Sequence, residues 1–266
     1  MARSETTALP LEIITAGQRR IATLVFCVMG AALAVAAVRS LDWDYVAGFD
    51  FRIVWSYRET LFRGFAATLA FTLAGIGFGI LIGTLAAMAS QSRWRFVRWL
   101  IAAYVEFWRD TPLLVQLIWI HFALPYLTGI QTTVGISGLI GLTLNTGAYH
   151  CEIVRAGIEA VPRGQWEAAY ALGLPGRVRW RRVILPQAIR IIVPPTVSLF
   201  ISVFKATAIL SILSVSELMR QVVGLSNFTY KPVEFYTAGA LIYVAAGLAF
   251  SMAARHIERR FRAAEG

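Results

Sequence analysis

A small set of polar and ionisable residues lies inside or beside the long apolar runs of this chain. Arg109 and Asp110 precede one run, Gln116 and Asn145 lie within runs, and Lys205 falls near the end of another. An ionisable group at membrane depth is costly and indicates a functional site. Neutral polar side chains there line a polar cavity or bond to a facing helix. These five residues are therefore candidates for a solute pathway.

Each candidate also has a purely structural explanation. Arg109 and Asp110 are expected to pair with each other at the inner boundary of the membrane. Lys205 is near enough to the outer interface to extend its ammonium group into water. Asn145 and Gln116 are expected to bond to a facing helix rather than to a solute.

The sequence shows no pattern for catalysis, metal binding or nucleotide binding. His121, His150 and His256 are scattered and do not form a HExxH pattern. No P-loop of the form GxxxxGK[ST] is present, and Gly77-x-Gly79 has no strand before it and no correctly spaced third glycine. We therefore predict a protein that is not an enzyme, with no catalytic residue, no metal site and no cofactor.

Composition indicates that the elements holding these residues cross a membrane. Hydrophobic residues make up 58% of the 266 residues and charged residues 15%, and the mean hydropathy is +0.63. Soluble domains have about 25% charged residues. The net charge of +10 comes from basic residues that flank apolar runs, which favours contact with lipid over nucleic acid.

The apolar runs predict an all-α, polytopic membrane protein with about six transmembrane helices. Residues 97–108 are expected to form an elbow along the interface, and the third crossing begins near Thr111 because Pro112 suits a first helical turn. Gly75, Gly79 and Gly83 share one face of the second span, where a neighbouring helix can approach closely. The predicted spans are 21–38, 61–89, 112–127, 134–154, 188–213 and 235–254.

Most of the 25 Lys and Arg residues lie at the termini, in 93–98 and in 155–190. Cytoplasmic segments carry an excess of these residues. The asymmetry predicts that both termini and the 155–190 segment are cytoplasmic.

The most patterned polar segment is EAAYALGLPGRVRWRRVILP, residues 167–186. Pro162 can begin a helix, and the following residues are good helix formers. Trp166, Ala169 and Tyr170 are expected to share one face. Gly173 offers a left-handed C-cap, and Pro175 prevents continuation. The segment is thus predicted to hold a short capped helix outside the membrane, either as a lipid anchor or as a handle for a partner.

The same stretch resembles the EAA loop of permease subunits in bacterial ATP-binding-cassette importers. Glu167-Ala168-Ala169, then Gly173, then Leu185-Pro186 have the spacing of that motif, with Val183 where isoleucine is usual. The stretches RDTPLLVQL, LTLNTGAYHCEIVRAGI and FKATAILSIL are similar to the polar amino acid uptake branch, which includes permeases for histidine, glutamine, glutamate and arginine. The branch often has RGTP where this chain has RDTP. The resemblance covers roughly residues 60–260.

The resemblance implies a MetI-like importer permease fold with a cytoplasmic coupling helix in the bacterial inner membrane. Its implied partners are a dimer of cytoplasmic ATP-binding subunits, a second permease subunit (identical or paralogous), a periplasmic amino-acid-binding protein and membrane lipid, with no nucleic acid. It adds Thr111 and Pro112 to the substrate-pathway residues. The implied ATPase-coupling residues, in or beside the 162–186 loop, are Gln165, Glu167, Ala168, Ala169, Gly173, Leu185 and Pro186.

The implied organisation has three parts. Residues 1–60 form a cytoplasmic tail, an extra first helix and a periplasmic loop. Residues 61–254 form a five-helix permease core with its coupling loop at 155–186, and residues 255–266 form a basic cytoplasmic tail. The alternative functions are a stand-alone secondary transporter or channel, which usually shows internal repeats, and a membrane-embedded enzyme. No repeat and no catalytic constellation is visible.

Overall fold

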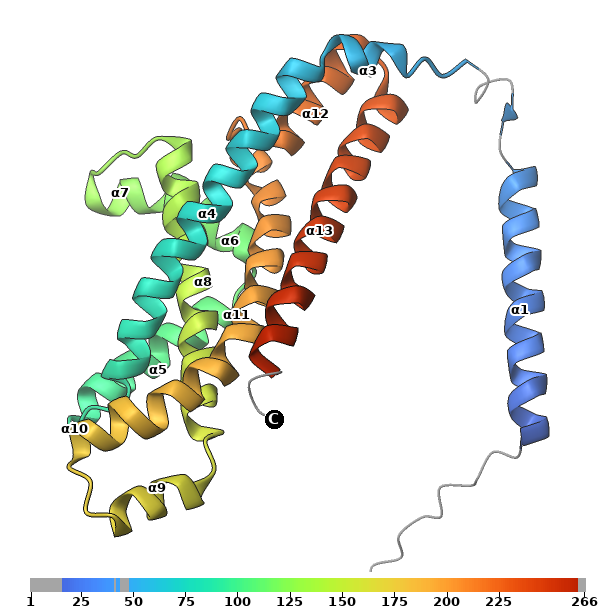
Figure 1. Ribbon diagram of the computed structural model, residues 1–266. Helices are drawn as coiled ribbons and strands as arrows, with labels where there is room; N and C mark the ends of the chain where they lie inside the picture. Colours follow the sequence, from blue (N-terminus) through green and yellow to red (C-terminus); the bar gives the residue numbers. More distant parts are fainter. Residues whose placement is uncertain (1–15, 41, 44–47, 263–266) are drawn as a thin grey trace, which may run out of the picture. The chain divides into compact units, whose positions relative to one another are not determined.

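The computed structural model describes residues 16–40, 42–43 and 48–262. The chain divides into two compact units, Met1–Asp50 and Phe51–Gly266. The first unit contains α1 (Ala16–Arg39), on which large apolar side chains such as Phe26 and Leu33 are exposed. No β-strand occurs in the described residues, and the predicted all-α class is confirmed (Figure 1).

The second unit contains all the remaining helices. In chain order they are α3 (Arg52–Ser56), α4 (Arg58–Ala89), α5 (Arg95–Asp110), α6 (Leu113–Ile118), the π turn η1 (Trp119–Ala123), α7 (Leu124–Thr128), α8 (Val134–Glu159), α9 (Arg163–Ala171), α10 (Gly176–Arg179), the π turn η2 (Trp180–Ile184), α11 (Leu185–Ala206), the 3₁₀ helix η3 (Thr207–Leu213), α12 (Leu218–Thr229) and α13 (Pro232–Arg262).

Three helical stretches of the described chain are long and apolar enough to cross a bilayer: Arg58–Ala89, Gly176–Leu213 and Pro232–His256. The pair α5 and α6–α7, bent by 107°, meets the same criterion only when its two halves are counted as one broken span. The other two predicted spans are helical; the described side chains of α1 include the apolar stretch Thr23–Leu33, and α8 does not pass this test of composition. Because α8 packs against α4, α5 and α11, its many buried residues face protein, and polar side chains are tolerated there.

The closest packing of the unit joins α4 to α8 through the predicted glycine face. A Cβ atom on Gly79 would lie 2.5 Å from Cγ2 of Thr146, and one on Gly83 would lie 2.5 Å from the carbonyl oxygen of Gly147. On Gly75 it would lie 2.8 Å from Cδ2 of Leu142. Contacts below 3.0 Å leave no room for any side chain, so this prediction is confirmed.

The predicted change of direction before Pro112 is also present, whereas the position of residues 97–108 along the interface stays a prediction. α5 ends at Asp110, Thr111 and Pro112 are extended, and α6 begins at Leu113. The residue before a proline avoids the helical region, and Pro112 supplies no N–H for α5 to continue. The bend follows from this single dipeptide.

One expectation about the approach to the fifth span is wrong. The arginine-rich segment is not a loop, because a continuous run of helix begins at Gly176 and passes through η2 into α11. Pro194 and Pro195 do not interrupt that helix, since α11 runs without a break from Leu185 to Ala206. The change to π geometry lies earlier, at Trp180–Ile184.

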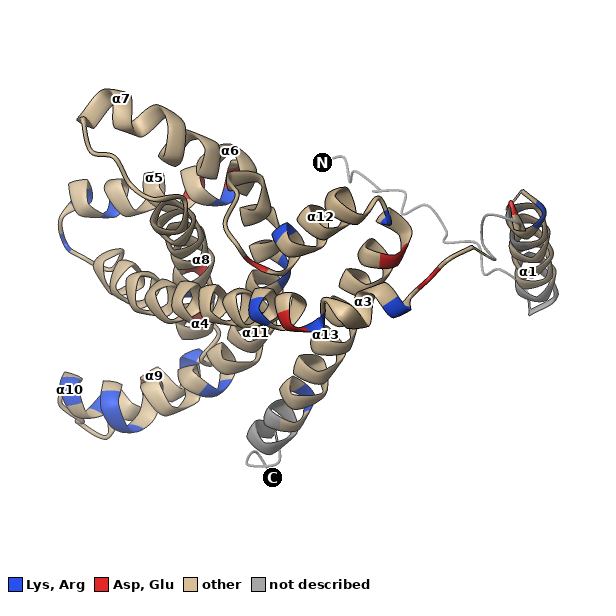
Figure 2. Cartoon of the chain, turned by 90° about the horizontal axis from the view of Figure 1, so that it is seen from above, with Lys and Arg blue, Asp and Glu red and all other residues tan. Residues whose placement is uncertain are grey.

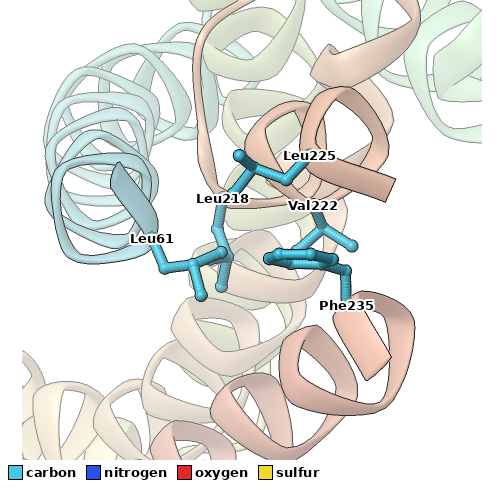
Figure 3. Close-up of a cluster of buried hydrophobic side chains, with 5 residues drawn as sticks. All are labelled: Leu61, Leu218, Val222, Leu225 and Phe235. Atoms are coloured by element: carbon cyan, nitrogen blue, oxygen red, sulfur yellow. The ribbon is translucent and has the colours of Figure 1, made fainter. Parts of the chain in front are cut away.

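At one end of the unit, α12 joins α4 and α13 through an apolar cluster (Figure 3). Leu61 of α4, Leu218 and Val222 of α12 and Phe235 of α13 are all buried. Figure 1 shows α9 and α10 at the opposite end of this unit. The α12 end thus holds an apolar cluster, and the opposite end holds the arginines of α10 and η2.

Candidate pathway pocket and coupling helix

The break between α5 and α6 opens onto a pocket of about 600 Å³. One wall is the break itself, a second is α8, and a third is α11 with the start of η3. The residues lining it are Arg109, Asp110, Thr111, Pro112, Leu113, Leu142, Asn145, Thr146, Tyr149, Leu199, Ser202, Val203, Ala206 and Ile209. Five of the predicted pathway residues, Arg109 to Pro112 and Asn145, thus meet at one pocket.

Gln116 and Asn145 hold the broken end of α5 in place. The Gln116 amide donates to the carbonyl oxygen of Trp108 at 3.0 Å and to the hydroxyl of Thr111 at 2.6 Å. The Asn145 amide donates to the same Trp108 oxygen at 2.8 Å and to Oε1 of Gln116 at 3.1 Å. The last carbonyl groups of a helix lack internal partners. The expected helix-contact role of Gln116 and Asn145 is confirmed, and Asn145 lines the pocket as well.

Arg109 does not pair with Asp110, and that expectation is wrong. Its guanidinium lies 4.0 Å from the Glu152 carboxylate and 5.6 Å from the centre of the Tyr149 ring. Both partners lie on α8, one turn apart. The Arg109 side chain therefore contacts α8 and not the neighbouring Asp110 of its own helix. About two-fifths of the Arg109 side chain (38%) remains exposed, which leaves donors free to meet an anion.

Two hydroxyl groups near the pocket have no hydrogen-bond partner among the described residues, those of Thr143 and Thr146. Thr146 lines the pocket and is 1% exposed. Lys205 is exposed on α11 and does not line the pocket. The structure therefore separates Lys205 from the other pathway candidates, and its role stays a prediction.

The predicted short helix is α9, and its ends are those expected. Gly173 has a φ of +66°, its N–H donates to Tyr170 at 2.9 Å, and the N–H of Leu174 donates to Ala169 at 3.2 Å. This pair of bonds is a Schellman motif, in which glycine takes the left-handed position at least cost.

The faces of α9 differ from the prediction in one respect. Trp166 packs edge to face on Trp180, with ring centres 5.6 Å apart, and Ala169 is 2% exposed. Tyr170 is 74% exposed, so it does not share a face with Ala169 as the sequence indicated. Ala169 is buried within the protein itself, because α9 packs back onto η2.

The remaining coupling candidates fall into two groups. Gln165, Glu167 and Ala168 are exposed on α9. Leu185 and Pro186 begin α11, and the neighbouring Gln187 donates to Gln165 at 3.1 Å. The hydrogen bond joins the two halves of the motif directly.

A second pocket of about 590 Å³ lies beside α9. Arg155 and Glu159 of α8, Arg163 and Trp166 of α9, and Gln91 at the end of α4 line it. Arg155 pairs with Glu152 and binds both oxygens of Glu159, at 2.8 and 3.0 Å. Figure 2 shows the basic residues of this end in blue over α9 and α10.

Glu217 is a buried residue that sequence reasoning missed. It caps α12 by accepting from the N–H groups of Met219 and Arg220 at 2.9 and 2.8 Å. It also accepts from the hydroxyls of Thr68 at 3.2 Å and Tyr243 at 3.0 Å. Burial raises the pKa of Glu217, although these four donors oppose that shift. The only signal in the sequence was a glutamate just before a helical run.

Among the described residues, no group of three or more His, Cys, Asp and Glu side chains is placed to hold a metal ion.

Comparison with known protein families matches residues 79–263 to the family described as binding-protein-dependent transport system inner membrane component. A putative glutamine transport system permease protein, GlnP, of Rickettsia bellii is 37% identical over 222 residues, which cover 82% of this chain and 98% of that protein. The L-cystine transport system permease protein TcyB of Bacillus subtilis is 37% identical over 223 residues, which cover 83% and 92%.

Solved structures show the same similarity. A crystal structure described as an amino acid ABC transporter with histidines has a TM-score of 0.77 and 36% identity, and the match covers 80% of this chain and 99% of that chain. The MetNI methionine ABC transporter has a TM-score of 0.65 at 20% identity, covering 77% and 98%. The second likeness is one of fold alone.

Proposed function

Because the chain belongs to the family of inner membrane components of binding-protein-dependent transport systems, we propose that it forms half of an ATP-driven import pathway for an amino acid. The relatives named for glutamine and L-cystine, and the similar amino acid transporter structure, support an amino acid as the solute. In this family the permease is not the enzyme, and ATP is hydrolysed by a separate subunit.

The observation that carries the proposal is α9, a short helix fixed at both ends and projecting from the spans. Its C-cap is the Schellman motif at Gly173, and its base is held by the Trp166–Trp180 contact. Glu167 and Ala168 remain exposed. The small Ala168 allows a partner to approach closely, and Glu167 offers it a charge. We propose that each of two ATP-binding subunits receives one such helix and moves α11 through it.

The route from α9 to the spans is short. The Gln165–Gln187 hydrogen bond ties α9 to the start of α11, and α11 lines the pathway pocket further along. A displacement of α9 therefore reaches Ser202 and Val203 through a single continuous helix. This arrangement supports mechanical coupling between the ATPase and the pocket.

A second permease subunit, identical or paralogous, completes the proposed pathway. Within the described chain, few residues of the three candidate spans are buried: 28%, 28% and 11% of the residues in the most apolar stretch of each span. The pocket also opens outward beside the exposed Arg109 and Asp110. Such a half-open pocket suits a pathway that is closed by a second copy or a paralogue.

The pathway pocket suits a small zwitterion. Arg109 can meet the carboxylate of an amino acid, because its guanidinium is only loosely held by Glu152 at 4.0 Å. Asp110 can meet the ammonium group, and the unpaired hydroxyl of Thr146 is available to either. Thr111 and Pro112 fix the break that presents these groups.

We place the protein in a bacterial inner membrane with both termini in the cytoplasm. Arginines concentrated around α9 and α10 support a cytoplasmic position for that end, because cytoplasmic segments are enriched in basic residues. A periplasmic amino-acid-binding protein then docks at the α12 end. In this arrangement residues 61–254 are the permease core, with 1–60 and 255–266 as extensions.

Co-purification distinguishes this function from a secondary transporter or channel. The chain is expressed with the ATPase and binding-protein genes of its own operon, and the tagged permease is purified in mild detergent. An ATPase subunit retained at stoichiometric ratio, together with uptake that needs ATP, supports the proposal. Uptake driven by an ion gradient without any ATPase would establish the alternative.

A further inference from the structure

An apolar cavity of about 600 Å³ lies between α4, α8 and the η2–α11 helix; it shares no lining residue with the pathway pocket and only Leu185 with the coupling candidates. This volume is within the roughly 300–1,000 Å³ range of small-molecule sites. Its lining is almost entirely apolar and includes Thr84, Met88, His150, Val154, Trp180 and Ile189.

The floor of the cavity is rigid because it is made of tight helix crossings. His150 is 3% exposed and lies against Gly83, where an added Cβ would be 2.8 Å from the His150 Cβ. A Cβ on Gly157 would be 2.4 Å from Cγ1 of Ile192. Because α8 is in tight contact with both α4 and α11, these helices cannot move closer together to close the cavity. The cavity is therefore preformed.

The mouth of the cavity opens toward an apolar medium. Met88 is 67% exposed, Leu185 40% and Ile189 44%. All three lie on helices that are long and apolar enough to cross a bilayer. Exposed apolar side chains around an apolar cavity favour a hydrocarbon occupant over water or a polar solute.

At the α9 end of the cavity the lining includes the polar Gln91. Trp180 lies there, and tryptophan prefers the boundary between membrane and water. Arg181 and Arg182 follow Trp180 directly, and Arg93 comes two residues after the lining residue Gln91. The guanidinium groups of these three arginines form no ion pair within the described chain. Three exposed arginines that lie close in sequence to the lining residues Gln91 and Trp180 favour an anionic ligand.

We propose that this cavity binds one acyl chain of an anionic phospholipid whose headgroup phosphate pairs with Arg181 and Arg182. The lipid belongs to the leaflet at the α9 end, which is the cytoplasmic leaflet in the proposed orientation. One lipid would fill a space bounded by α4, α8 and α11, and its chain contacts Ile189 one turn from the start of the helix that α9 moves. The lipid thereby stiffens the link between α9 and the spans.

Photo-crosslinking tests this site directly. The full-length chain is placed in nanodiscs of neutral phosphatidylethanolamine with a trace of phosphatidylglycerol that carries a diazirine on its acyl chain. Crosslinks are mapped by mass spectrometry. We expect them to concentrate on Val154 and Ile189 over Leu241, an exposed residue of α13, and to be displaced by unlabelled phosphatidylglycerol but not by phosphatidylethanolamine.

Two matched variants complete the test. Ile189→Trp fills the cavity and should abolish crosslinking at Val154, whereas Leu241→Trp makes the same change outside the cavity and should not. Arg181→Gln and Arg182→Gln should each weaken retention of phosphatidylglycerol about fivefold, since an arginine near an anionic lipid surface contributes a factor of that order. Equal labelling of Leu241 and Val154 in the wild-type protein would overturn the proposal, as would no preference for the anionic lipid. Either result would assign the cavity to bulk lipid or to a second protein chain.

Discussion

The side-chain amide of Asn145, on α8, donates a 2.8 Å hydrogen bond to the backbone oxygen of Trp108, near the end of α5. The bond spans 37 residues of sequence and fixes the α5–α6 break against the helix that forms the opposite wall of the pathway pocket. The shape of that pocket therefore depends on the amides of Asn145 and Gln116, which donate to the same oxygen.

Asn145→Leu should lower the free energy of unfolding by about 1–3 kcal/mol, since it removes a half-buried donor and leaves Oε1 of Gln116 without its partner. Thermal unfolding of the purified protein measures the change. Asn227→Leu, on the exposed surface of α12, is the matched control and should unfold like the wild type. Equal melting temperatures for both variants would show that the break is held by other contacts.

Gly83→Ala should destabilise the α4–α8 contact, because the new Cβ would lie 2.5 Å from the Gly147 carbonyl oxygen, which is backbone and cannot turn aside. Overpacking of this kind costs about 1–3 kcal/mol. Gly77→Ala on the same helix has nothing within 4 Å and should be neutral or slightly stabilising. The melting temperature should be highest for Gly77→Ala, intermediate for the wild type and lowest for Gly83→Ala. A reversed order would argue against the close approach of α4 and α8.

Glu217 should make stability depend on pH. Since burial raises its pKa in the folded protein, its contribution is fully present below the unfolded-state pKa of about 4.3 and is lost as pH rises through the folded-state value. Glu217→Gln removes this titration. When both proteins are measured from pH 4.5 to 8, the melting temperature of the wild type should fall relative to that of the variant as pH rises. The opposite trend would mean that the four donors outweigh burial.

The arrangement of basic residues predicts the topology. In a background with Cys27 and Cys151 replaced by serine, a cysteine at Gln165 should resist a membrane-impermeant thiol reagent applied from the periplasm. A cysteine at Gly48 should react under the same conditions. Both should react after the membrane is permeabilised. Labelling of the residue 165 cysteine in intact cells would reverse the proposed orientation.

The sequence was most informative where structure is local. The helix face of Gly75, Gly79 and Gly83, the break at Thr111–Pro112 and the C-cap at Gly173 each depend on the preferences of a few neighbouring residues, and the structure contains all three. The grouping of Arg109 to Pro112 with Asn145 was predicted as a set, but its geometry was not.

Sequence reasoning failed where a residue depends on a distant partner. Glu217 meets Thr68 across 149 residues, and Arg109 turns to Glu152 on another helix, although its neighbour Asp110 is the nearest charge in sequence. The buried position of Ala169 likewise depends on how α9 packs against η2. Pro194 and Pro195 did not break α11, because tertiary packing overrode a local helix-breaking preference.

The central claim is that α9 transmits the motion of the ATPase. Gly173→Arg imposes about 1–2 kcal/mol of strain at a backbone with a φ of +66°, and it places a bulky cation at the end of α9. Gly224→Arg, on α12 at the other end of the unit, adds the same side chain at a glycine without a positive φ, where nothing lies within 4 Å. Both variants should insert at normal levels, since the spans are untouched.

The decisive measurement is amino acid uptake into proteoliposomes that contain the permease, its ATPase and its binding protein, with substrate-stimulated ATP hydrolysis recorded in parallel. Gly173→Arg should lose most uptake and most of the stimulation, with less ATPase retained, while Gly224→Arg keeps its ATPase. Uptake, stimulation and ATPase retention equal to wild type in Gly173→Arg would contradict the account and make the α9 loop a lipid anchor.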